Sequence, residues 1–379
     1  MKSLFREIFK ADVEHTYKAP ARINLIGEHI DYNGGKVFPC AIDKYITAYV
    51  SLRKDKELHL FSKGKDMRVA SLDNLDFNEK MRWEKYPLGA FYILSKKGYN
   101  FPFGLNIYYE SEIPVGSGLS SSAALLDLTV FLLSDIYKFS LDRKEITLLA
   151  KAVENDYLHL KSGIMDQAII ALGKENSGML LDCNSFTFDY HDINLGDYEF
   201  VVLKSNKPRS LVESKYNERV EECEKALKAL KKVYKVEKLV DLKVDQLSNA
   251  KVILYDDVLY RRVKHVVTET DRVNRFLNAL KEENVPELGK ILDESHLSLK
   301  DDYEVTGFHL DSLQVACKDA GAVGARMTGA GFGGCAIALI EKEYFPKFKK
   351  RVTTRYLELT GLKPDVFEIK IVSGVSKNN

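Results

Sequence analysis

The stretch PVGSGLSSSAALL, residues 114–126, sets two glycines and four serines directly before an apolar run. Before it, residues 103–114 (FGLNIYYESEIP) alternate apolar and polar side chains, which predicts a strand. Residues 120–138 are long and apolar enough to predict a largely buried helix. A strand, a glycine–serine loop and a helix N-terminus together form a cradle for a phosphate, because free N–H groups and the helix dipole favour an anion there.

The loop differs from two familiar phosphate-binding loops. It lacks the GxxxxGK[ST] spacing of a P-loop, and Ser121 stands where the GxGxxG fingerprint needs its third glycine. Its serine hydroxyls add hydrogen-bond donors and can ligate Mg²⁺. Taken alone, the stretch is equally compatible with a surface loop followed by a serine-capped helix.

A second stretch, APARINLIGEHIDYNGGKVFPCAID (19–43), gathers charged side chains of both signs around a turn. It holds Arg22, Glu28, His29 and Asp31 near a glycine and ends at the turn signal Asn-Gly-Gly. Carboxylates accept hydrogen bonds from sugar hydroxyls, and an arginine can approach a phosphate with two N–H groups. The alternative is a hairpin whose charges are merely solvated.

Composition narrows the class of protein. The 379 residues suggest two domains, and 56 basic against 55 acidic residues leave a net charge of +1, which excludes recruitment of nucleic acid or of a membrane surface by the overall charge. Five cysteines without a CxxC pair argue against a disulfide framework and for a reducing compartment. With no signal-peptide core and no apolar run of about 18 residues, we expect a cytoplasmic protein without a membrane segment.

The order of predicted elements indicates an α+β fold. A helix over 142–160 with Ser140 as its N-cap follows the buried helix, and strands are expected over 178–190 and 198–204. From residue 213 the chain becomes helical and highly charged, with long helices over 257–281 and 286–297. Strands return at 335–340 and 366–373. We therefore place the domain boundary near residue 196, between an N-terminal domain of residues 1–196 and a C-terminal domain of residues 197–379.

Three motifs carry a resemblance to a known family. RINLIGEHIDYNGG resembles the galactokinase signature, and PVGSGLSSSAAL and RMTGAGFGGCAIAL (326–339) resemble the second and third motifs of the GHMP small-molecule kinases. Further similarity in SLFREIF, KVFPCAID, SGIMDQAII, LLDCNSF and KYNERVEEC extends it to nearly the whole chain. The resemblance implies a two-domain GHMP kinase fold with mixed and antiparallel sheets and an active-site cleft between the domains.

The resemblance also implies roles for individual residues. Asp166, in the GIMDQ segment, matches the catalytic base near the sugar C1 hydroxyl, with Arg22 beside it and beside the transferred phosphate. The residues that match sugar contacts are Glu28, His29, Asp31, Gly163 and Tyr216. The second motif matches the ATP-binding loop, Gly116, Ser117, Gly118, Leu119, Ser120, Ser121 and Ser122. Magnesium would be held by Ser122 and Glu154.

Each of these residues also has a plain structural interpretation. Asp166 lies in an apolar segment, where a buried carboxylate needs a nearby cation, and Arg22 is the natural candidate. The two could form a purely structural pair, Glu154 a solvated helix residue, and Tyr216 a packing residue. His29, beside two carboxylates, could orient them rather than bind sugar. The glycines of the third motif could serve only a tight helix-to-strand connection.

Two positions depart from the family pattern, which often reads APGR and GEHTDY. Ala21 indicates that the turn before Arg22 uses ordinary backbone angles, because alanine lacks glycine's freedom at positive φ. Ile30 removes one hydroxyl between two expected sugar ligands. Neither departure changes a side chain with an expected role, but both bear on sugar selectivity.

The resemblance implies an ATP- and Mg²⁺-dependent kinase that phosphorylates the C1 hydroxyl of α-D-galactose to give galactose 1-phosphate and ADP. One alternative keeps the chemistry and changes the sugar to N-acetylgalactosamine, L-arabinose or galacturonate. The other is a galactose and ATP sensor that has lost catalysis, although GLSSSAA is uninterrupted and Asp166 is present. We expect a monomer whose partner is a small molecule.

Overall fold

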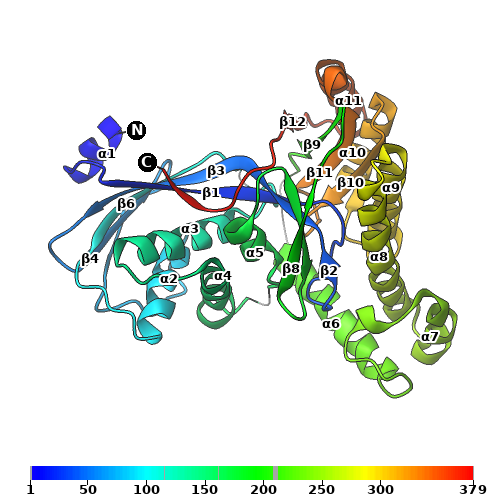
Figure 1. The fold of residues 1–379 in the computed structure, drawn as a ribbon, viewed down its shortest axis with the longest axis horizontal. Coiled ribbons are helices and arrows are strands. Elements are labelled where there is room, and N and C mark those ends of the chain that lie inside the picture. The colour runs from blue at the N-terminus through cyan, green and yellow to red at the C-terminus, as the bar shows by residue number, and fades with distance from the viewer. Residues whose placement is uncertain (1, 115, 161, 208–211, 379) are drawn as a thin grey trace.

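The computed structural model describes residues 2–114, 116–160, 162–207 and 212–378. Figure 1 shows two lobes side by side, the first built on a large sheet with helices below it and the second dominated by long helices. The chain begins and ends on the first lobe, because its last strand returns to the large sheet. The boundary near residue 196 stays a prediction.

The large sheet has six strands in the order β13-β1-β3-β6-β4-β5. Its pairs are antiparallel except for β4 with β6, which is parallel. A bulge interrupts the pairing of β1 with β3 between Pro20 and Ala21, and Ala21 keeps an ordinary φ, as its side chain predicts. The strands are β1 (His15–Asn24), β3 (Pro39–Leu52), β4 (Glu57–Ser62), β5 (Arg68–Ser71), β6 (Leu105–Ser111) and β13 (Ser376–Asn378).

Helices cover one face of this sheet, and α3 and α5 pack directly on β1 and β3. They are α2 (Lys85–Lys96), α3 (Ser121–Ile136), α4 (Arg143–Ala152) and α5 (Met165–Leu172), while α1 (Lys2–Phe9) lies apart at the N-terminus. The buried helix after the serine-rich loop is thus confirmed as α3. The N-cap predicted for the next helix is wrong: Asp142, not Ser140, caps α4, because Asp142 and Glu145 form a reciprocal capping box.

Two further strand predictions need correction. The strand expected over 178–190 is a hairpin of β7 (Ser177–Asp182) and β8 (Thr187–Asp192), which joins β2 (Lys36–Val37) in a small sheet. The Asp182 carboxylate accepts hydrogen bonds from two backbone N–H groups that follow it and so forms the turn. The strand expected over 366–373 ends at Glu368, because the chain then leaves its sheet and crosses back toward β3.

The second lobe is a four-stranded antiparallel sheet between two layers of helices. Its order is β10-β11-β9-β12, from β9 (Tyr198–Lys204), β10 (Gly324–Thr328), β11 (Cys335–Glu341) and β12 (Asp365–Glu368). Val201 and Leu203 of β9 pack into the core under α10 and α11, whereas Phe200 and Val202 pack into the larger core on the other face. Successive strand residues point to opposite faces, so this apolar strand is buried on both sides.

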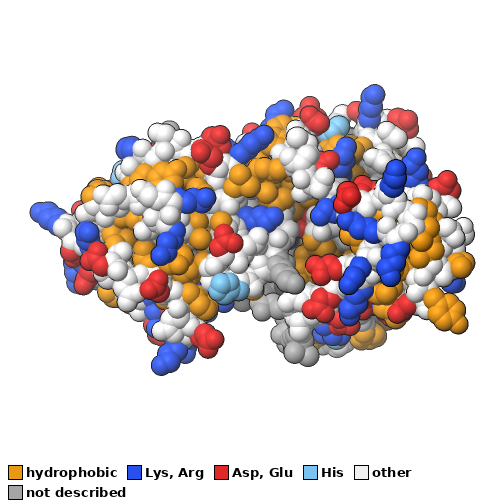
Figure 2. All heavy atoms as spheres, turned by 90° about the horizontal axis from the view of Figure 1, so that it is seen from below, with side chains coloured by type: hydrophobic (Ala, Val, Ile, Leu, Met, Phe, Trp, Pro, Cys, Tyr) orange, Lys and Arg blue, Asp and Glu red, His pale blue; other side chains and the backbone are white. Residues whose placement is uncertain are grey.

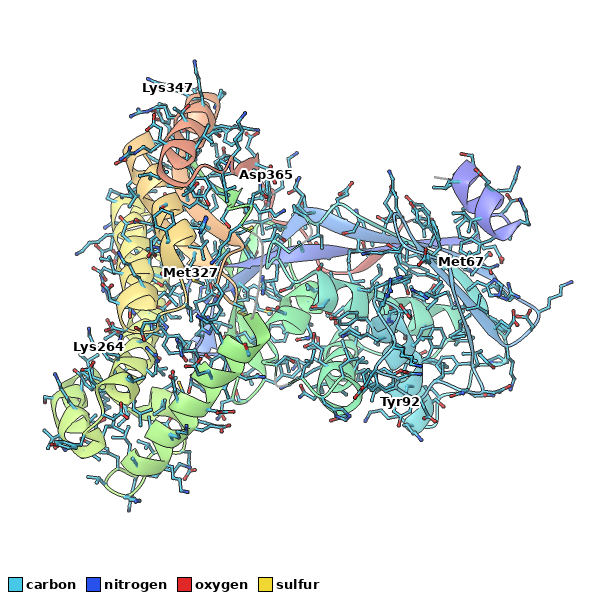
Figure 3. All side chains as sticks on the ribbon, turned by 180° about the vertical axis from the view of Figure 1, so that it is seen from behind. Met67, Tyr92, Lys264, Met327, Lys347 and Asp365 are labelled. Carbon is cyan, nitrogen blue, oxygen red and sulfur yellow. The ribbon has the colours of Figure 1, made fainter. Side chains whose placement is uncertain are left out.

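The helices of the second lobe are α6 (Val212–Leu230), α7 (Leu247–Leu254), α8 (Asp257–Lys281), α9 (Val285–Asp301), α10 (Gly307–Ala320) and α11 (Phe345–Thr360). The long helix predicted over 257–281 is confirmed as α8. Seen from behind in Figure 3, Met327 of β10 lies on the side of the second lobe that faces the first, and Lys347 of α11 projects outward.

The surface and the cysteines agree with the composition. On the face shown in Figure 2, acidic and basic side chains are interspersed over both lobes. None of the five cysteines forms a disulfide. Among the residues described, no helix combines the length and the apolar character needed to cross a bilayer.

Candidate active site

The expected sugar-binding residues meet in one cavity of ≈170 Å³. This is smaller than the roughly 300–1,000 Å³ of drug-sized ligand sites, so it suits a single sugar ring. Five parts of the chain form its wall: the end of β1 with the turn that follows it, the segment after α4, the approach to α5 with its first turn, the start of α6, and the loop between β10 and β11. The residues are Arg22, Glu28, His29, Asp31, Glu154, Ser162, Gly163, Met165, Asp166, Gln167, Tyr216, Gly329 and Ala330.

Arg22 and Asp166 form a two-point ion pair in the wall. Arg22 Nε and Nη2 donate to the two carboxylate oxygens of Asp166 at 2.7 and 2.8 Å. Arg22 is buried near the end of β1, and Asp166 is partly exposed in the first turn of α5. The predicted cation for Asp166 is therefore confirmed as Arg22. Parallel N–H donors fix both the distance and the plane of the carboxylate.

The serine-rich loop approaches the same pair from the other side. Arg22 Nη1 donates to the Gly118 carbonyl at 2.8 Å, and the Ser120 hydroxyl donates to Asp166. Ser120 has a φ of 62° and gives no side-chain cap to α3, so its hydroxyl serves the aspartate instead. Helix α3 begins at Ser121, directly after the loop, as predicted. That the loop and this helix N-terminus bind a phosphate stays a prediction.

The other loop residues surround this contact. Leu119 is buried, Ser121 is exposed, Ser122 is half-buried, and Gly116 and Gly118 have positive φ. In the described wall, residues 116–122 do not border the cavity; they reach it through Arg22 and Asp166. The serine-rich loop therefore lies next to the sugar-sized cavity, and the Arg22–Asp166 ion pair contacts both.

Asp31 and Gly163 are in close contact across the cavity. A β-carbon added at Gly163 would lie 1.8 Å from the Asp31 carboxylate oxygen, so only glycine fits there. Burial, together with the nearby charge of Asp166, raises the pKa of Asp31 to about 7. This carboxyl therefore changes its protonation state near neutral pH.

Glu28 is buried against a residue of the third motif. Arg326 Nη2 donates to one Glu28 carboxylate oxygen, and Asn24 Nδ2 donates to the other at 3.2 Å. Burial raises the pKa of Glu28, and the Arg326 guanidinium opposes that shift. Arg326 lies within the RMTGAGFGG stretch, but sequence reasoning assigned no role to it. A charged residue at the start of a glycine cluster was the available signal.

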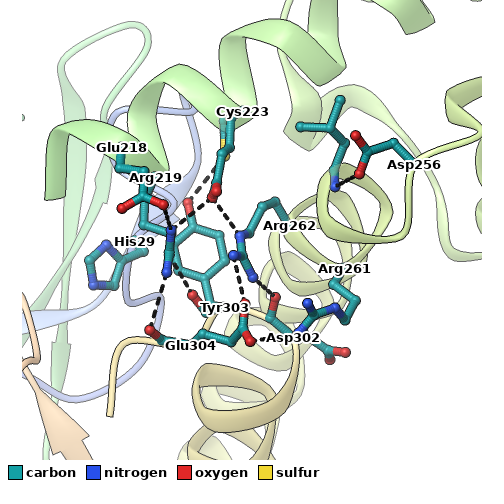
Figure 4. A network of polar contacts seen from close by, with 12 residues as sticks. His29, Glu218, Arg219, Cys223, Asp256, Arg261, Arg262, Asp302, Tyr303 and Glu304 are labelled. Carbon is teal, nitrogen blue, oxygen red and sulfur yellow. Dashed lines mark hydrogen bonds and ion pairs between the residues drawn. The ribbon is translucent and has the colours of Figure 1, made fainter. Parts of the chain in front are cut away.

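His29 and Tyr216 bring the turn after β1 and α6 together. Their ring centroids lie 5.7 Å apart, and Tyr216 also meets the edge of Tyr32 at 5.3 Å. Burial lowers the pKa of His29 to about 3, so its ring is neutral at physiological pH. Figure 4 shows His29 beside Tyr303 and Arg219, next to a network of polar contacts in the second lobe.

A contact from α8 holds the turn in place. The Glu269 carboxylate accepts hydrogen bonds from the backbone N–H groups of Gly27 at 3.0 Å and Glu28 at 3.3 Å. His265 Nε2 lies 3.0 Å from the carbonyl of Glu28. Glu269 is buried and lies 242 residues from Gly27 in the chain. Sequence reasoning missed it, because nothing in the helical pattern of 257–281 marks this glutamate.

The expected magnesium ligands have suitable chemistry. Mg²⁺ prefers oxygen ligands, and Ser122 and Glu154 supply a hydroxyl and a carboxylate. Glu154 is buried, accepts a 2.7 Å hydrogen bond from Gln167, and has its pKa raised by burial. Nearby Asp127 on α3 is buried with no hydrogen bond to either carboxylate oxygen within the described chain. A cation would neutralise such a region, so these residues fit the ion.

The described residues supply few side-chain ligands for a metal ion. Over the described ranges, no three His, Cys, Asp or Glu side chains are grouped so that they could hold a metal ion. With two protein ligands, most coordination positions of the ion would be filled by water or by phosphate oxygens, which is the usual way proteins bind Mg²⁺.

Three family models match the chain in sequence order. The galactokinase galactose-binding signature matches residues 3–52, the GHMP kinases N terminal domain matches residues 85–174, and the GHMP kinases C terminal matches residues 276–357. The first match contains the turn after β1, the second the serine-rich loop and Asp166, and the third the loop between β10 and β11.

Curated relatives and solved structures agree over the full length. The galactokinase of Clostridium tetani is 42% identical and covers 99% of this chain and 96% of its own; that of Clostridium beijerinckii is 39% identical and covers 100% and 98%. The crystal structure of Lactococcus lactis galactokinase complexed with galactose has a TM-score of 0.96 at 39% identity, covering 100% of this chain and 98% of that one. Methanococcus jannaschii mevalonate kinase, at 22% identity and a TM-score of 0.68, covers 95% and 99% and shares the fold. The GHMP kinase fold is confirmed, and the chain belongs to the galactokinases.

Proposed function

We propose that this galactokinase transfers the γ-phosphoryl group of ATP to the C1 hydroxyl of α-D-galactose, giving α-D-galactose 1-phosphate and ADP. The observation that carries the proposal is the Arg22–Asp166 pair, which lies between the sugar-sized cavity and the serine-rich loop. The Lactococcus galactokinase of the same fold was solved with galactose, which supports the choice of sugar.

Asp166 is the proposed base and Arg22 the residue that positions it. As the C1 oxygen attacks the γ-phosphorus, the bond from that phosphorus to the β,γ-bridging oxygen breaks, and ADP leaves. Asp166 accepts the proton of the C1 hydroxyl. Because phosphoryl transfer passes through a loose transition state, alignment and charge neutralisation matter more than the strength of the base. Arg22 supplies both: it holds the carboxylate plane and brings a buried positive charge to the reacting oxygens.

The sugar site combines hydrogen-bond acceptors with aromatic side chains. We assign Glu28 and Asp31 to accept hydrogen bonds from galactose hydroxyls, the backbone at Gly163 to contact the sugar, and Tyr216 to close the cavity from α6. His29 forms the wall between Tyr216 and the third-motif loop. All these residues border the cavity, which supports their assignment to one ligand.

ATP is a substrate of the reaction, and its phosphates are assigned to residues 116–122. The backbone N–H groups at the start of α3 and the glycines before it suit a polyphosphate. Ser122 and Glu154 would hold Mg²⁺, which when bound supplies positive charge to the phosphate oxygens. None of the five cysteines forms a disulfide, so we expect the protein to act in the reducing cytoplasm. We also keep the expectation of a monomer.

The test is ADP formation with purified protein, ATP and Mg²⁺, using galactose and, in parallel, N-acetylgalactosamine, L-arabinose and galacturonate. We expect the highest kcat/KM with galactose and a product phosphorylated at C1. A higher kcat/KM with another sugar would transfer the assignment to that sugar. Binding of galactose and ATP without ADP formation would identify a sensor instead of a kinase.

A further inference from the structure

A line of hydrogen bonds leads from the sugar cavity into the second lobe. His29 Nε2 lies 3.2 Å from the Ala330 carbonyl, and His29 Nδ1 lies 3.0 Å from the Tyr32 hydroxyl. The Tyr32 and Tyr303 hydroxyls lie 2.8 Å apart, and the Tyr303 hydroxyl lies 3.1 Å from Cys223 Sγ. We call these four residues, His29, Tyr32, Tyr303 and Cys223, the His29–Cys223 network.

The two ends of the network determine where every proton lies. The Ala330 carbonyl can only accept, so His29 Nε2 carries a hydrogen. Because the ring is neutral, Nδ1 is an acceptor, and Tyr32 must donate its single hydrogen to it. Tyr32 then accepts from Tyr303.

The same reasoning continues to α6. Tyr303 has used its hydrogen on Tyr32, so it accepts from the Cys223 thiol. The remaining neighbour of the sulfur is Asn33 Nδ2, at 3.7 Å, which can only donate and which also donates to the His29 carbonyl at 3.1 Å. All donors and acceptors therefore match in one direction, from Asn33 through the network to Ala330.

Both ring nitrogens of His29 are thus bonded within the protein. A sugar hydroxyl could reach either nitrogen only by displacing Tyr32 or Ala330. The aromatic faces remain available for packing, and Tyr216 lies against His29 at 5.7 Å and against Tyr32 at 5.3 Å. The network therefore fixes the two rings on which this cavity-lining tyrosine rests.

We propose that Tyr303 and Cys223 are positioning residues for the galactose site, because they complete the hydrogen-bond chain that directs the Tyr32 hydroxyl toward Nδ1 of His29 and fix the rings that support Tyr216. The proposal rests on the proposed function of this cavity and deepens it. According to this proposal, His29 contacts the sugar through the surface of its ring and not through hydrogen bonds from its ring nitrogens. It also ties the turn after β1 to α6. On that helix Arg219 donates to the Tyr303 carbonyl (Figure 4), and Glu222 accepts a hydrogen bond from Arg262.

The first test reads the network without activity. Nitrogen-15 labelling of the eight histidines, with the His29 signals assigned by their loss in His29→Gln, reports which ring nitrogen carries hydrogen. We expect a protonated Nε2 and an unprotonated Nδ1 in the free protein. In Tyr303→Phe the tautomer should persist while the Nδ1 signal moves, because Tyr32 loses its incoming donor. An Nδ1–H or charged ring, or an unmoved signal in Tyr303→Phe, overturns the proposal.

The second test is kinetic. Tyr303→Phe removes one oxygen and should raise KM for galactose about 3- to 10-fold, the effect of one hydrogen bond, with kcat changed less than about 2-fold. Tyr108→Phe is the matched control, because its hydroxyl is also buried but has no hydrogen-bond partner in the described chain. Equal kinetics for the two variants would contradict the proposal.

A pair of variants at α6 covers the case in which Tyr303→Phe does not fold. Cys223→Ser keeps a donor and an acceptor, whereas Cys223→Ala leaves Tyr303 without its donor. We expect the KM for galactose of the serine variant to lie closer to wild type than that of the alanine variant, and the reverse order contradicts the proposal. If wild-type protein fails to phosphorylate galactose, the proposed function fails, and the histidine spectra still decide the network.

Discussion

Arg22 and Asp166 are 144 residues apart in sequence, yet two nitrogens of one meet two oxygens of the other at 2.7 and 2.8 Å. The pair joins β1 of the large sheet to the first turn of α5. It also receives the Ser120 hydroxyl from the start of α3. Three elements therefore converge on one carboxylate, which explains why the reaction is assigned to this point.

Replacing Asp166 by Asn keeps the shape of the side chain and removes its ability to take a proton. We expect kcat to fall about 10²-fold or more, within the range for a general base, while KM for galactose changes little. Steady-state ADP formation measures both constants, and circular dichroism checks the fold. Undiminished kcat in the folded variant would contradict the role of Asp166.

Replacing Arg22 by Lys preserves the charge but not the planar pair of donors. Lysine cannot contact both oxygens of Asp166 and the Gly118 carbonyl at once, so we expect kcat to fall at least about 10-fold. The matched control is Arg275→Lys, which alters a multipoint ion pair between α8 and α9 away from the cavity. An equal loss of kcat in both variants would show that Arg22→Lys acts through protein stability and not through the active site.

The pH dependence of sugar binding follows from Asp31. Because its pKa is raised to about 7, Asp31 is protonated below neutral pH and loses acceptor capacity for sugar hydroxyls. We expect kcat/KM for galactose to be level above about pH 8 and to fall up to about tenfold per pH unit below 7. Asp31→Asn should flatten this part of the profile. A wild-type profile without a bend near 7 would contradict the assignment.

The same shift has a consequence for stability. Between the ordinary value of 3.8 and about 7, folded Asp31 binds a proton that the unfolded chain has released. Its contribution to the free energy of unfolding therefore falls as pH rises through that window. Asp31→Asn removes this loss, so the variant should gain in Tm relative to wild type between pH 5 and pH 8. Thermal unfolding at both pH values checks the sign.

Gly163→Ala tests the contact with Asp31. The new methyl group would lie 1.8 Å from the Asp31 oxygen and must displace it, so we expect KM for galactose to rise about 10-fold or more. In the Asp31→Ala background the methyl group meets no carboxylate. The two effects should then be clearly non-additive in a double-mutant cycle. Additive effects of the two substitutions on KM would show that Gly163→Ala does not act through Asp31.

Glu269→Gln tests the support of the turn from α8. Burial acts to raise the pKa of Glu269, but the neighbouring positive charge, chiefly Arg272, outweighs it and lowers the pKa to about 2. Removing the charge leaves Arg272 buried without its partner, so we expect a loss of about 3–5 kcal/mol in unfolding free energy. We also expect KM for galactose to rise several-fold, because the backbone of Gly27 and Glu28 loses a charged acceptor.

The control for that prediction is Glu294→Gln, which breaks a half-exposed pair with Arg275 and should cost no more than about 1 kcal/mol. The sign with pH is opposite to that of Asp31. A lowered pKa contributes stability that is complete above the ordinary value of 4.5 and is lost as pH falls toward 2. Chemical denaturation at pH 7 and pH 4 measures both effects. Equal losses in the two variants would contradict a special role for Glu269.

Local signals sufficed for several features and failed for others. Residues 257–281 form one helix as predicted, because apolar spacing and charge fix a long helix locally. The N-cap of α4 was misplaced, because Ser140 and Asp142 are both good caps and only Asp142 has Glu145 three residues later. The strand expected over 178–190 is a hairpin, because the Asp182 carboxylate accepts two hydrogen bonds from backbone N–H groups and so turns the chain. The signal for this turn is as local as the β pattern on either side of it.

The sequence by itself determined the polar residues of the site and their family, because the three motifs are contiguous and each carries its chemistry in a short run of residues. It also predicted the partnership of Arg22 and Asp166, since a carboxylate in an apolar segment needs a cation. Only the tertiary structure decided which distant groups hold these residues: Glu269 at the turn, Arg326 at Glu28, and Tyr303 with Cys223 behind His29. The physical reason is that hydrogen bonds between buried groups depend on positions in space, which residues far apart in sequence acquire only when the two lobes pack together.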